Sequence, residues 1–525
     1  MKILIQNACL YDGTGSAPVQ ADILMDKQRI LRVGKNLPKD DAEVVDAAGK
    51  AVTPGWIDIH RHCDLAALTD PDFGEAEFRQ GLTSVIGGNC GLGVTADTGA
   101  SYDQASALIA PCLGSTESFH FFGMKQYLNT LEKVKLRVNM GMLAAAGTIK
   151  IAVKGFGKTP FTAQQMSNAR ALLREQLEDG AFGVSLGIMY PPECYTTTEE
   201  YAQWLSVCAP FHRPMCCHIR GEGDSLTESV REVIEIGRRA EIPVHISHFK
   251  CTGRKNWHRG IYRAIEEIEK ARAHGQDVTV DFYPYTAGAT TLLSLLPPTV
   301  LEEDDNRLWD KAGTAEGVKQ IREALLHAPA GWDNMIDAIG YERILIANAA
   351  FEGGEKLAGK SLTEAAEILG MEDPTEAMCV LLNRTRGNTG VILQSMDEED
   401  LKEVAKLPYS LLISDALYGP GATHPRLYGA FPRAIRQLVC QEHVLTLEEA
   451  IRKMSFLPAQ RLGLEDRGQL KEGMRADVLV FDPKKLRDLA TYESPRLFSS
   501  GMDHVYVGGC DVLTKKTPNG TVLRK

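Results

Sequence analysis

The sequence lacks the features that mark membrane, nucleic-acid-binding and fibrous proteins. It contains no uncharged run of about 18 apolar residues, the length that a membrane-spanning helix requires. Basic residues are not in excess, because 58 lysines and arginines stand against 69 aspartates and glutamates, for a net charge of -11. This balance gives neither a basic groove for nucleic acid nor a polybasic patch for a membrane surface. We therefore expect no nucleic-acid partner and no membrane partner.

A secretory leader and a disulfide pattern are missing as well. The first residues, MKILIQNACLYDG, reach Asn7 and Asp12 without the continuous apolar stretch of a signal peptide. The simplest expectation is a cytoplasmic protein whose 12 cysteines are thiols or metal ligands, since the cytosol is reducing. Cys216 and Cys217 lack the Cys-x-x-Cys spacing of a redox site, so we interpret them as core residues. The sequence has no internal repeat, and nothing in it indicates the oligomeric state.

The two ends of the chain share a strand-rich pattern. At 525 residues, with 44% hydrophobic and 24% charged residues, the chain is long enough for one large domain and a smaller one. Short apolar segments bounded by turns, such as KILIQNACLY and ADVLVFDP, occur near both termini. We expect a small β-sandwich domain built from residues 1–54 and 468–525, around a central domain of residues 55–467.

The central region alternates apolar strands with amphipathic helices. Its strand patterns include TSVIGGNCG, FGVSLGIMY, PMCCHIRGEG, IPVHISHFK, DVTVDFYPY and YSLLISDAL, and helical patterns such as TAQQMSNARALLREQLEDG lie between them. This alternation predicts an α/β fold, a (β/α)8 TIM-like barrel. Residues 286–350 are too many for a simple loop, and we expect them to form a lid over the barrel mouth.

Polar residues alternate along the segment PGWIDIHRHCDL. Successive side chains of a strand point to opposite faces, so His60 and His62 are expected to share one face. Asp58 and Asp64 are expected on that same face, and we interpret them as supports for the histidines. A divalent metal is the common way to satisfy paired buried imidazoles. The alternative is an exposed strand end, because a His-x-His pair also occurs by chance.

Other predicted strands also end in residues that can bind a metal. These residues are Cys90, His218, His248 and Asp415. Singly, each has an ordinary explanation as a buried thiol, a loop histidine or a helix cap. Active sites of such barrels lie at the carboxyl ends of the strands, so the joint placement of the four favours a metal site. His245 is expected on the face opposite His248, and we interpret it as structural.

Seven segments, in order along nearly the whole chain, are similar to those of a known family. They are PGWIDIHRHCDL, GLTSVIGGNCG, HIRGEG, ISHFK, DFYPYTAGATTLLSLLP, ISDAL and HPRLYGAFPR. Together they resemble the amidohydrolase superfamily, and specifically its N-acyl-D-amino-acid deacylase (D-aminoacylase) branch. The first segment alone indicates only the superfamily. The strand end at Cys90 together with HPRLYGAFPR indicates the branch.

The resemblance implies a zinc enzyme with one tightly bound ion and a second, weaker metal position. The implied ligands of the tight ion are Cys90, His218 and His248, whereas His60, His62 and Asp415 border the weaker position. Cys90 stands where many relatives have a carboxylated lysine that bridges two metals. A thiolate with imidazoles also suits zinc on chemical grounds, because zinc is a borderline-soft ion.

The resemblance also implies the reaction, hydrolysis of an N-acyl-D-amino acid to a D-amino acid and a carboxylic acid. Asp415 is the natural proton carrier, taking a proton from the attacking water and delivering it to the leaving nitrogen. A free substrate carboxylate needs cations, and Arg426 suits bidentate recognition. The residues implied as substrate-binding are Lys250, Arg426, Tyr190, and Tyr283 or Tyr285. The preference for the D form rests on the resemblance alone.

Two other functions and several other roles compete with this interpretation. A cyclic amide hydrolase of the hydantoinase or dihydroorotase kind normally uses the bridging lysine, so Cys90 counts against it. A catalytically inactive barrel, used as an interaction subunit, has no need of an intact metal site. Tyr190 and Tyr283 are equally well explained as aromatic residues that pack at the rim of the barrel. Arg220 shares a strand face with His218, and either binds substrate or pairs with the acidic residues that follow it, Glu222 and Asp224.

Overall fold

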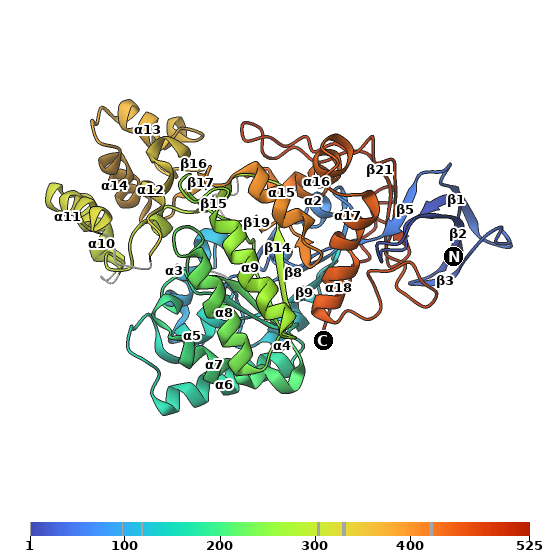
Figure 1. Cartoon of the computed structure of the whole chain (residues 1–525), viewed down its shortest axis with the longest axis horizontal. Helices are drawn as coiled ribbons and strands as arrows, with labels where there is room; N and C mark the ends of the chain where they lie inside the picture. Colours follow the sequence, from blue (N-terminus) through green and yellow to red (C-terminus); the bar gives the residue numbers. More distant parts are fainter. Residues whose placement is uncertain (1, 97, 117–118, 302–304, 328–331, 419–423) are drawn as a thin grey trace.

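The structure is a computed structural model that describes residues 2–96, 98–116, 119–301, 305–327, 332–418 and 424–525. Its centre is a barrel of parallel strands surrounded by helices, with a small sheet on one side and a helical insertion on the other (Figure 1). The barrel strands are β6 (Trp56–Asp58), β7 (Arg61–His62), β8 (Leu82–Gly87), β9 (Asn139–Met142), β10 (Ala144–Ala145), β11 (Val184–Gly187), β12 (Met215–His218), β13 (Val244–Ile246), β14 (Val278–Phe282), β18 (Ser410–Leu412) and β19 (Ala416–Leu417).

Hydrogen bonds close these strands into a ring. One run is β6-β8-β9, and the other is β10-β11-β12-β13-β14-β18. β9 and β10 follow one another directly, with Leu143 between them. The N–H of Leu143 donates to the carbonyl of Gly87 at the end of β8, so the first run continues into the second. β19, which follows β18, pairs in parallel with β7 and completes the ring. The predicted barrel is therefore confirmed, and the carboxyl ends of all its strands meet at one face.

The strand over residues 139–145 was not among those predicted from the sequence. Its segment, NMGMLAA, is rich in glycine, alanine and asparagine, which have low strand propensity. Burial on both faces decides its conformation, since all four residues of β9 are buried. Parallel barrel strands are covered by helices outside and side chains inside, so packing outweighs the weak local preference.

The helices around the barrel follow the amphipathic patterns. In α8 (Leu226–Ala240) the buried residues Val230, Val233 and Ile236 repeat at helical spacing and face the strands. α6 (Ala163–Glu178) begins at Thr162, whose hydroxyl accepts the N–H of Gln165 in a capping box. The other helices outside the insertion are α1 (Ala66–Thr69), α2 (Glu75–Phe78), α3 (Tyr102–Leu113), α4 (Met124–Leu131), α5 (Ala146–Lys154), α7 (Thr198–Leu205), α9 (Gly260–Ala273), α15 (Glu398–Lys406), α16 (Arg426–Ala434), α17 (Leu447–Met454) and α18 (Phe456–Leu462).

Both ends of the chain contribute to a separate sheet of eight strands. Its hydrogen-bonded order is β22-β21-β20-β5-β1-β2-β3, with β4 also paired to β1. One hydrogen-bonded sheet connects all eight strands, because β1 pairs with β4 near its start and with β5 near its end. The strands are β1 (Lys2–Leu10), β2 (Val19–Asp26), β3 (Arg29–Gly34), β4 (Glu43–Asp46), β5 (Ala51–Pro54), β20 (Val478–Phe481), β21 (Met502–Val507) and β22 (Cys510–Asp511).

The insertion after β14 is a folded unit with its own hydrophobic core. The core includes Leu292, Ile346 and Leu382, and is separate from the barrel core. β17 pairs with both β15 and β16, so the unit continues past residue 350, where the predicted excursion ends, as far as Leu393. Its elements are β15 (Gly288–Thr291), α10 (Asp305–Ala312), α11 (Ala315–Leu326), α12 (Met335–Ile339), β16 (Ile344–Ile346), α13 (Leu362–Leu369), α14 (Pro374–Thr385) and β17 (Gly390–Leu393).

None of the helices in the described part of the chain has the length and apolar character needed to cross a bilayer.

Candidate metal centre and active site

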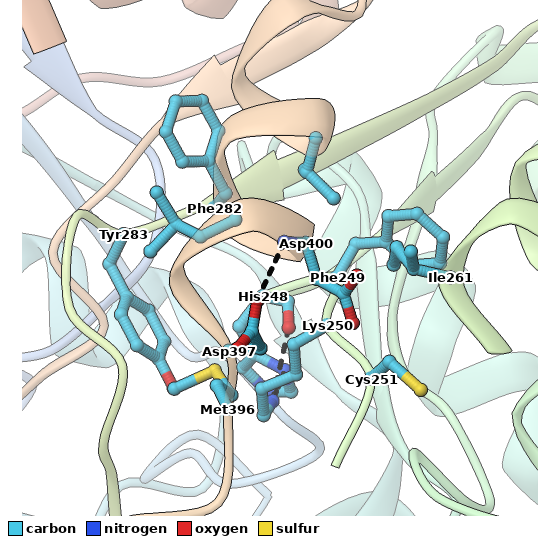
Figure 2. A pocket seen from close by; sticks show the side chains of 12 residues that line it. His248, Phe249, Lys250, Cys251, Ile261, Phe282, Tyr283, Met396, Asp397 and Asp400 are labelled. Carbon is cyan, nitrogen blue, oxygen red and sulfur yellow. Dashed lines mark hydrogen bonds between the residues drawn. The ribbon is translucent and has the colours of Figure 1, made fainter. Parts of the chain in front are cut away.

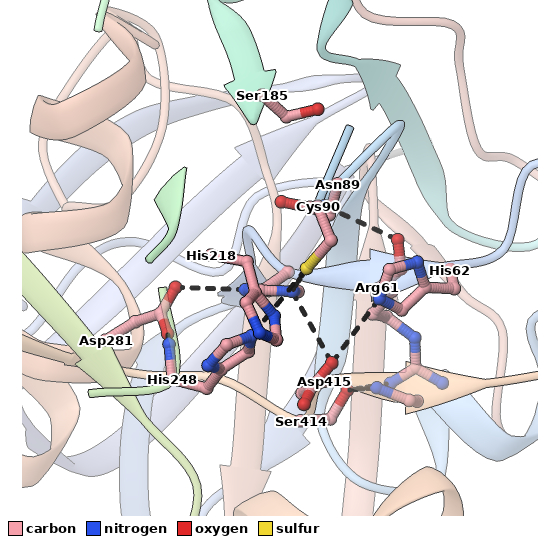
Figure 3. A network of polar contacts seen from close by, with 12 residues as sticks. Arg61, His62, Asn89, Cys90, Ser185, His218, His248, Asp281, Ser414 and Asp415 are labelled. Atoms are coloured by element: carbon pink, nitrogen blue, oxygen red, sulfur yellow. Dashed lines mark hydrogen bonds and ion pairs between the residues drawn. The ribbon is translucent and has the colours of Figure 1, made fainter. Parts of the chain in front are cut away.

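Cys90 lies at the middle of the polar cluster at the carboxyl ends of the barrel strands (Figure 3). Its Sγ is 3.2 Å from His60 Nε2 and 3.7 Å from His248 Nε2. Two sets of donor atoms share this thiol: His60, His62 and Cys90 form one, and Cys90, His218 and His248 the other. Within each set the donor atoms lie within 4.8 Å of one another, and every residue is buried. The structure thus brings together the five predicted thiol and imidazole ligands.

The donor set fits zinc in chemistry and spacing. Zinc bonds of about 2.3 Å to sulfur and about 2.0 Å to nitrogen place two tetrahedral donors about 3.5 Å apart. The observed sulfur-to-nitrogen distances of 3.2 and 3.7 Å lie on either side of that value. Burial raises the pKa of the Cys90 thiol well above its usual value, and the nearby Asp415 and Asp281 carboxylates add to the effect. A cation is therefore needed to stabilise the thiolate in this place.

Buried carboxylates orient the imidazoles. Asp281, in β14, places Oδ2 at 3.2 Å from His60 Nδ1 and at 2.9 Å from His245 Nε2. Glu222, in the loop after β12, places Oε1 at 2.9 Å from His248 Nδ1. Each carboxylate engages the outer ring nitrogen, so Nε2 of the same imidazole faces Cys90, an arrangement typical of metal-binding histidines.

Neither of these supporting roles was predicted from the sequence. Asp281 stands in the quoted segment DVTVDFYPY, where a lone acid inside a buried strand was the available signal. Glu222 was considered only as a partner of Arg220. In the structure Arg220 instead pairs with Glu232, at 2.8 Å, and donates to the carbonyls of Cys194 and Thr196. Arg220 is therefore part of the loop structure rather than of the site.

The predicted supports on the first strand hold backbone instead of imidazoles. Asp58 Oδ1 accepts the N–H groups of His60 and Ser414, both at 3.2 Å, and so joins the first and last strands. Asp64 Oδ2 accepts the N–H of Gly88 at 3.1 Å and holds the loop that leads to Cys90. The expected single strand is interrupted between β6 and β7, so simple alternation does not continue through it.

Asp415 lies over the histidines of the first strand. Its Oδ1 is 3.4 Å from both His60 Nε2 and His62 Nε2, and its Oδ2 is 2.9 Å from Arg426 Nη1. Although burial opposes ionisation, the Arg426 guanidinium and His60 hold the pKa of Asp415 well below its usual range. Asp415 is thus an ionised carboxylate beside two imidazoles, and its position over the cluster, rather than its lowered pKa, suits a proton acceptor.

Three residues of the cluster have left-handed backbone conformations. The φ angles are 54° for Cys90, 35° for His248 and 52° for Asp415. Such angles are unfavourable for residues other than glycine, at a cost of about 1–3 kcal/mol each. They occur where each strand turns into its loop and direct the three side chains to a common point. This kind of strain is found most often at functional sites.

A cavity of about 720 Å³ opens above the cluster. Lys250 lines it, with Nζ 2.5 Å from Glu222 Oε1, and so does Arg426, whose guanidinium lies over the ring of Tyr283. Tyr190 lines it too, with its hydroxyl 3.4 Å from His218 Nδ1. Four of the five predicted substrate-binding residues therefore face this space.

Tyr285 lies outside the described lining of that cavity. Its ring packs edge-on against His424, with centroids 5.0 Å apart. His424, which the sequence analysis did not single out, accepts the Arg426 N–H through Nδ1 at 3.1 Å, and its Nε2 is 2.9 Å from the Ala287 carbonyl. Tyr285 and His424 thus position the start of α16, where Arg426 is anchored. The available signal was the histidine two residues before Arg426 in the segment HPRLYGAFPR.

A second hollow, of about 340 Å³, lies beside the His248–Lys250 segment (Figure 2). It is lined by apolar side chains such as Phe249 and Phe282, and by Asp397 and Asp400. With His258, these two acids form a third, partly exposed group of possible metal donors. Both carboxylates already have structural roles, because Asp397 caps α15 and Asp400 accepts the N–H of His258. We assign no metal to this group.

A ring of parallel strands that gathers imidazoles, a thiol and a carboxylate at its carboxyl face defines a metal-dependent hydrolase barrel. Comparison with known proteins gives the family. Two models described as amidohydrolase family match residues 51–295 and 363–512. The chain belongs to the amidohydrolase family, in its branch of N-acyl-D-amino-acid deacylases.

Named relatives match over nearly their full lengths. The chain is 31% identical to the N-acyl-D-glutamate deacylase of Alcaligenes xylosoxydans xylosoxydans, covering 100% of this chain and 97% of that protein. It is 30% identical to the D-aminoacylase of the same organism, covering 99% and 96%. Among solved structures, the N-acyl-D-glutamate deacylase of Bordetella bronchiseptica, complexed with zinc and a phosphonate inhibitor, matches with a TM-score of 0.83, 30% identity and coverage of 100% and 99%.

Proposed function

We propose that this protein hydrolyses the amide bond of N-acyl-D-amino acids and releases a D-amino acid and a carboxylic acid. The observation that carries the proposal is the position of Cys90, whose thiol belongs to both sets of histidine donors and lies beneath Asp415. The chain is also about 30% identical to D-amino-acid deacylases over its whole length. The cofactor is zinc, with the tight ion at Cys90, His218 and His248 and a weaker position bordered by His60, His62 and Asp415. The substrate is a small molecule, and a cytoplasmic location stays a prediction from the sequence.

A zinc ion held by these residues would supply a water whose pKa is lowered to about 7 and would polarise the amide carbonyl. Asp415 acts as general base and then as general acid. Its ionised Oδ1 accepts the proton of the attacking water and later delivers it to the leaving nitrogen. The imidazoles 3.4 Å away and Arg426 at 2.9 Å keep the carboxylate ionised and oriented before the reaction begins.

Arg426 and Lys250 bind the carboxylate of the substrate in this proposal. Both cations line the cavity beside the donor cluster, and both have low exposure, with side chains 1% and 12% accessible. Their present partners are Asp415 and Glu222, so a bound carboxylate adds a second anion beside each cation. A fixed, partly desolvated pair of cations gives a strong and directional carboxylate site. Tyr190 and Tyr283 complete its walls.

A cyclic amide hydrolase is the second candidate within the fold. Dihydroorotases match this chain at 23–24% identity, and hydantoinase structures match at 13–16%, which supports a shared fold only. A thiol at position 90 and two cations facing the cavity favour a linear substrate with a free carboxylate. The inactive-barrel alternative has no feature in its favour, because the ligand set and its supporting carboxylates are all present.

The test is turnover of paired N-acetyl-D- and N-acetyl-L-amino acids by zinc-loaded protein, measured as release of free amino acid. We expect turnover of the D series only. Cys90→Ala is expected to lose both the tight zinc, measured by metal analysis, and the activity, whereas Cys208→Ala, at a buried cysteine outside both donor sets, retains both. Turnover of the L series, or full activity and zinc in Cys90→Ala, contradicts the proposal.

A further inference from the structure

The charge balance of the catalytic cavity bears on which D-amino acids fit it. Among the described residues, the charged groups that line the cavity are Lys250, Arg426, Glu222 and Asp415. These are two cations and two anions, and they are already paired, Lys250 with Glu222 at 2.5 Å and Arg426 with Asp415 at 2.9 Å. The described lining therefore holds no third cation, and both available ones are needed for the α-carboxylate of the substrate.

Apart from the imidazoles and the thiol of the two metal-donor sets, the rest of the described lining is apolar or hydroxylic, with one further thiol at Cys112. On the barrel side it includes Leu92, Met189 and Leu417, and on the insertion side Leu295, Met335 and Leu393. One of these two walls must face the side chain of the D-residue, and the other the acyl group. Neither wall offers a positive partner, so a second carboxylate is unpaired in either direction in which the substrate lies.

The hydroxyl groups of the cavity have limited capacity for a ligand. Ser294 donates to the carbonyl of Thr291 and receives the Thr290 hydroxyl, so both hydroxyls have partners within the insertion. Thr252 is 1% exposed, and its Oγ1 has no hydrogen-bond partner among the described residues. Hydroxyl groups such as these, and those of Ser395, Tyr190 and Tyr283, can bind a neutral amide or thioether, but they do not replace a cation for an ionised carboxylate.

We propose that the substrates of this enzyme carry a single negative charge, the α-carboxylate, with an uncharged D side chain and an uncharged acyl group. The inference rests on the proposed function and adds the substrate class. It separates this chain from its relatives named for D-glutamate and D-aspartate, whose substrates have a second carboxylate. A second carboxylate in this cavity loses its hydration without gaining a cation, which lowers transition-state binding.

The test compares matched pairs that differ in charge and not in size. We expect zinc-loaded enzyme to have kcat/KM values for N-acetyl-D-glutamine and N-acetyl-D-asparagine on the order of a hundredfold above those for N-acetyl-D-glutamate and N-acetyl-D-aspartate. N-acetyl-D-leucine and N-acetyl-D-methionine are expected to be good substrates, and N-succinyl-D-leucine a poor one. Acidic members that react as fast as their amides overturn this inference and leave the proposed function intact. Turnover of no member of the panel overturns the proposed function itself.

A cation introduced into the wall tests the cause. Met335→Lys is compared with Met335→Gln, a neutral side chain of similar length at the same place. We expect the lysine variant to exceed the glutamine variant about tenfold in kcat/KM for N-acetyl-D-glutamate or for N-succinyl-D-leucine, depending on which group faces the insertion. Equal kcat/KM of the two variants for both acidic probes, with retained turnover of N-acetyl-D-leucine, contradicts the missing cation as the cause.

Discussion

Individual side chains in this site work in pairs that join distant segments. His60 contacts Cys90 through one ring nitrogen and Asp281 through the other, and His248 has the same relation to Glu222. A metal-binding imidazole must be held in one tautomer and one orientation, and a carboxylate on its outer nitrogen provides both conditions. Asp281 and Glu222 are therefore as necessary to the centre as the residues that face the metal.

Glu193 is a buried acid directly behind the Cys90 loop. Its Oε1 accepts the N–H of Gly187 at 2.9 Å, and its Oε2 accepts the Tyr201 hydroxyl at 3.0 Å. A side chain at Gly91 would collide with this carboxylate, so the loop passes directly over it. Burial raises the pKa of Glu193 from 4.5 to about 7, despite these hydrogen bonds and the opposing charge of Lys150.

This pKa predicts a pH-dependent contribution to stability. Between pH 4.5 and about 7 the folded protein keeps a proton on Glu193 that the unfolded chain has lost, so stability declines as pH rises through this range. Glu193→Gln lacks this dependence. We expect the free energy of unfolding of the wild type, relative to Glu193→Gln, to fall by about 2 kcal/mol from pH 5.5 to 8 in urea titrations. Glu178→Gln, at an exposed position on α6, is the control, and a pH-independent difference for Glu193→Gln contradicts the prediction.

At the scale of elements, the insertion is fastened to the loop that carries Glu222. Asp333 is buried and accepts the N–H of Gly223 at 2.6 Å, the N–H of Ser225 at 3.0 Å and the Ser225 hydroxyl at 3.1 Å. Residues of the insertion also line the catalytic cavity, among them Leu295 and Met335. We infer that the insertion acts as the lid of the site and that Asp333 holds it against the barrel.

Asp333→Ala tests this role of the insertion. Loss of three hydrogen bonds to one carboxylate is expected to raise KM roughly tenfold and to speed proteolysis within residues 286–393. The tight zinc is expected to remain, since its ligands all belong to the barrel. Glu316→Ala, at an exposed position on α11 of the insertion, is the control and leaves KM unchanged. Loss of zinc from Asp333→Ala contradicts the lid interpretation, because the insertion then acts as structural support for the centre.

At the scale of the whole molecule, the C-terminal residues bind the barrel and not only the small sheet. Thr521 accepts the N–H of Met140 at 3.0 Å, and the N–H of Leu523 donates to the Met140 carbonyl at 2.7 Å. Leu523 is buried against the barrel core. The chain end thus adds an extra length of strand beside β9 and ties the terminal part of the chain to the catalytic domain.

Truncation measures the strength of this link. Removal of residues 519–525 is expected to lower the free energy of unfolding by at least about 3 kcal/mol, from lost backbone hydrogen bonds and the burial of Leu523. Removal of only Arg524 and Lys525 deletes the exposed Arg524–Glu132 pair and the Lys525 backbone contacts with Gly180 and Arg213, but leaves Leu523 in place. It is expected to cost about 1 kcal/mol. Urea unfolding followed by circular dichroism gives both values. Equal effects of the two truncations contradict a structural role for the strand.

Sequence patterns were informative wherever the signal is local. The strand over 139–145 went undetected because its glycine, alanine and asparagine residues have weak strand propensity, and burial by neighbours decides its form. The insertion was expected to end at residue 350 but continues to Leu393. The pairing of β17 with β15 and β16 that extends it is a long-range contact, which local sequence patterns do not show. Asp58 was expected beside the imidazoles, but the break between β6 and β7 directs it to Arg61 and Ser414.

By itself, the sequence determined the barrel, the β domain shared by both termini, and the thiol, imidazoles and carboxylate at the strand ends, since residue type and periodicity carry that information along the chain. Only the tertiary structure decided which groups meet: Asp281 reaches His60 across 221 residues, and Glu222 takes His248 and Lys250 instead of Arg220. Such contacts depend on closure of the ring of strands, which places side chains from distant segments at one face. The charge balance of the cavity, and with it the expected substrate class, exists only after that closure.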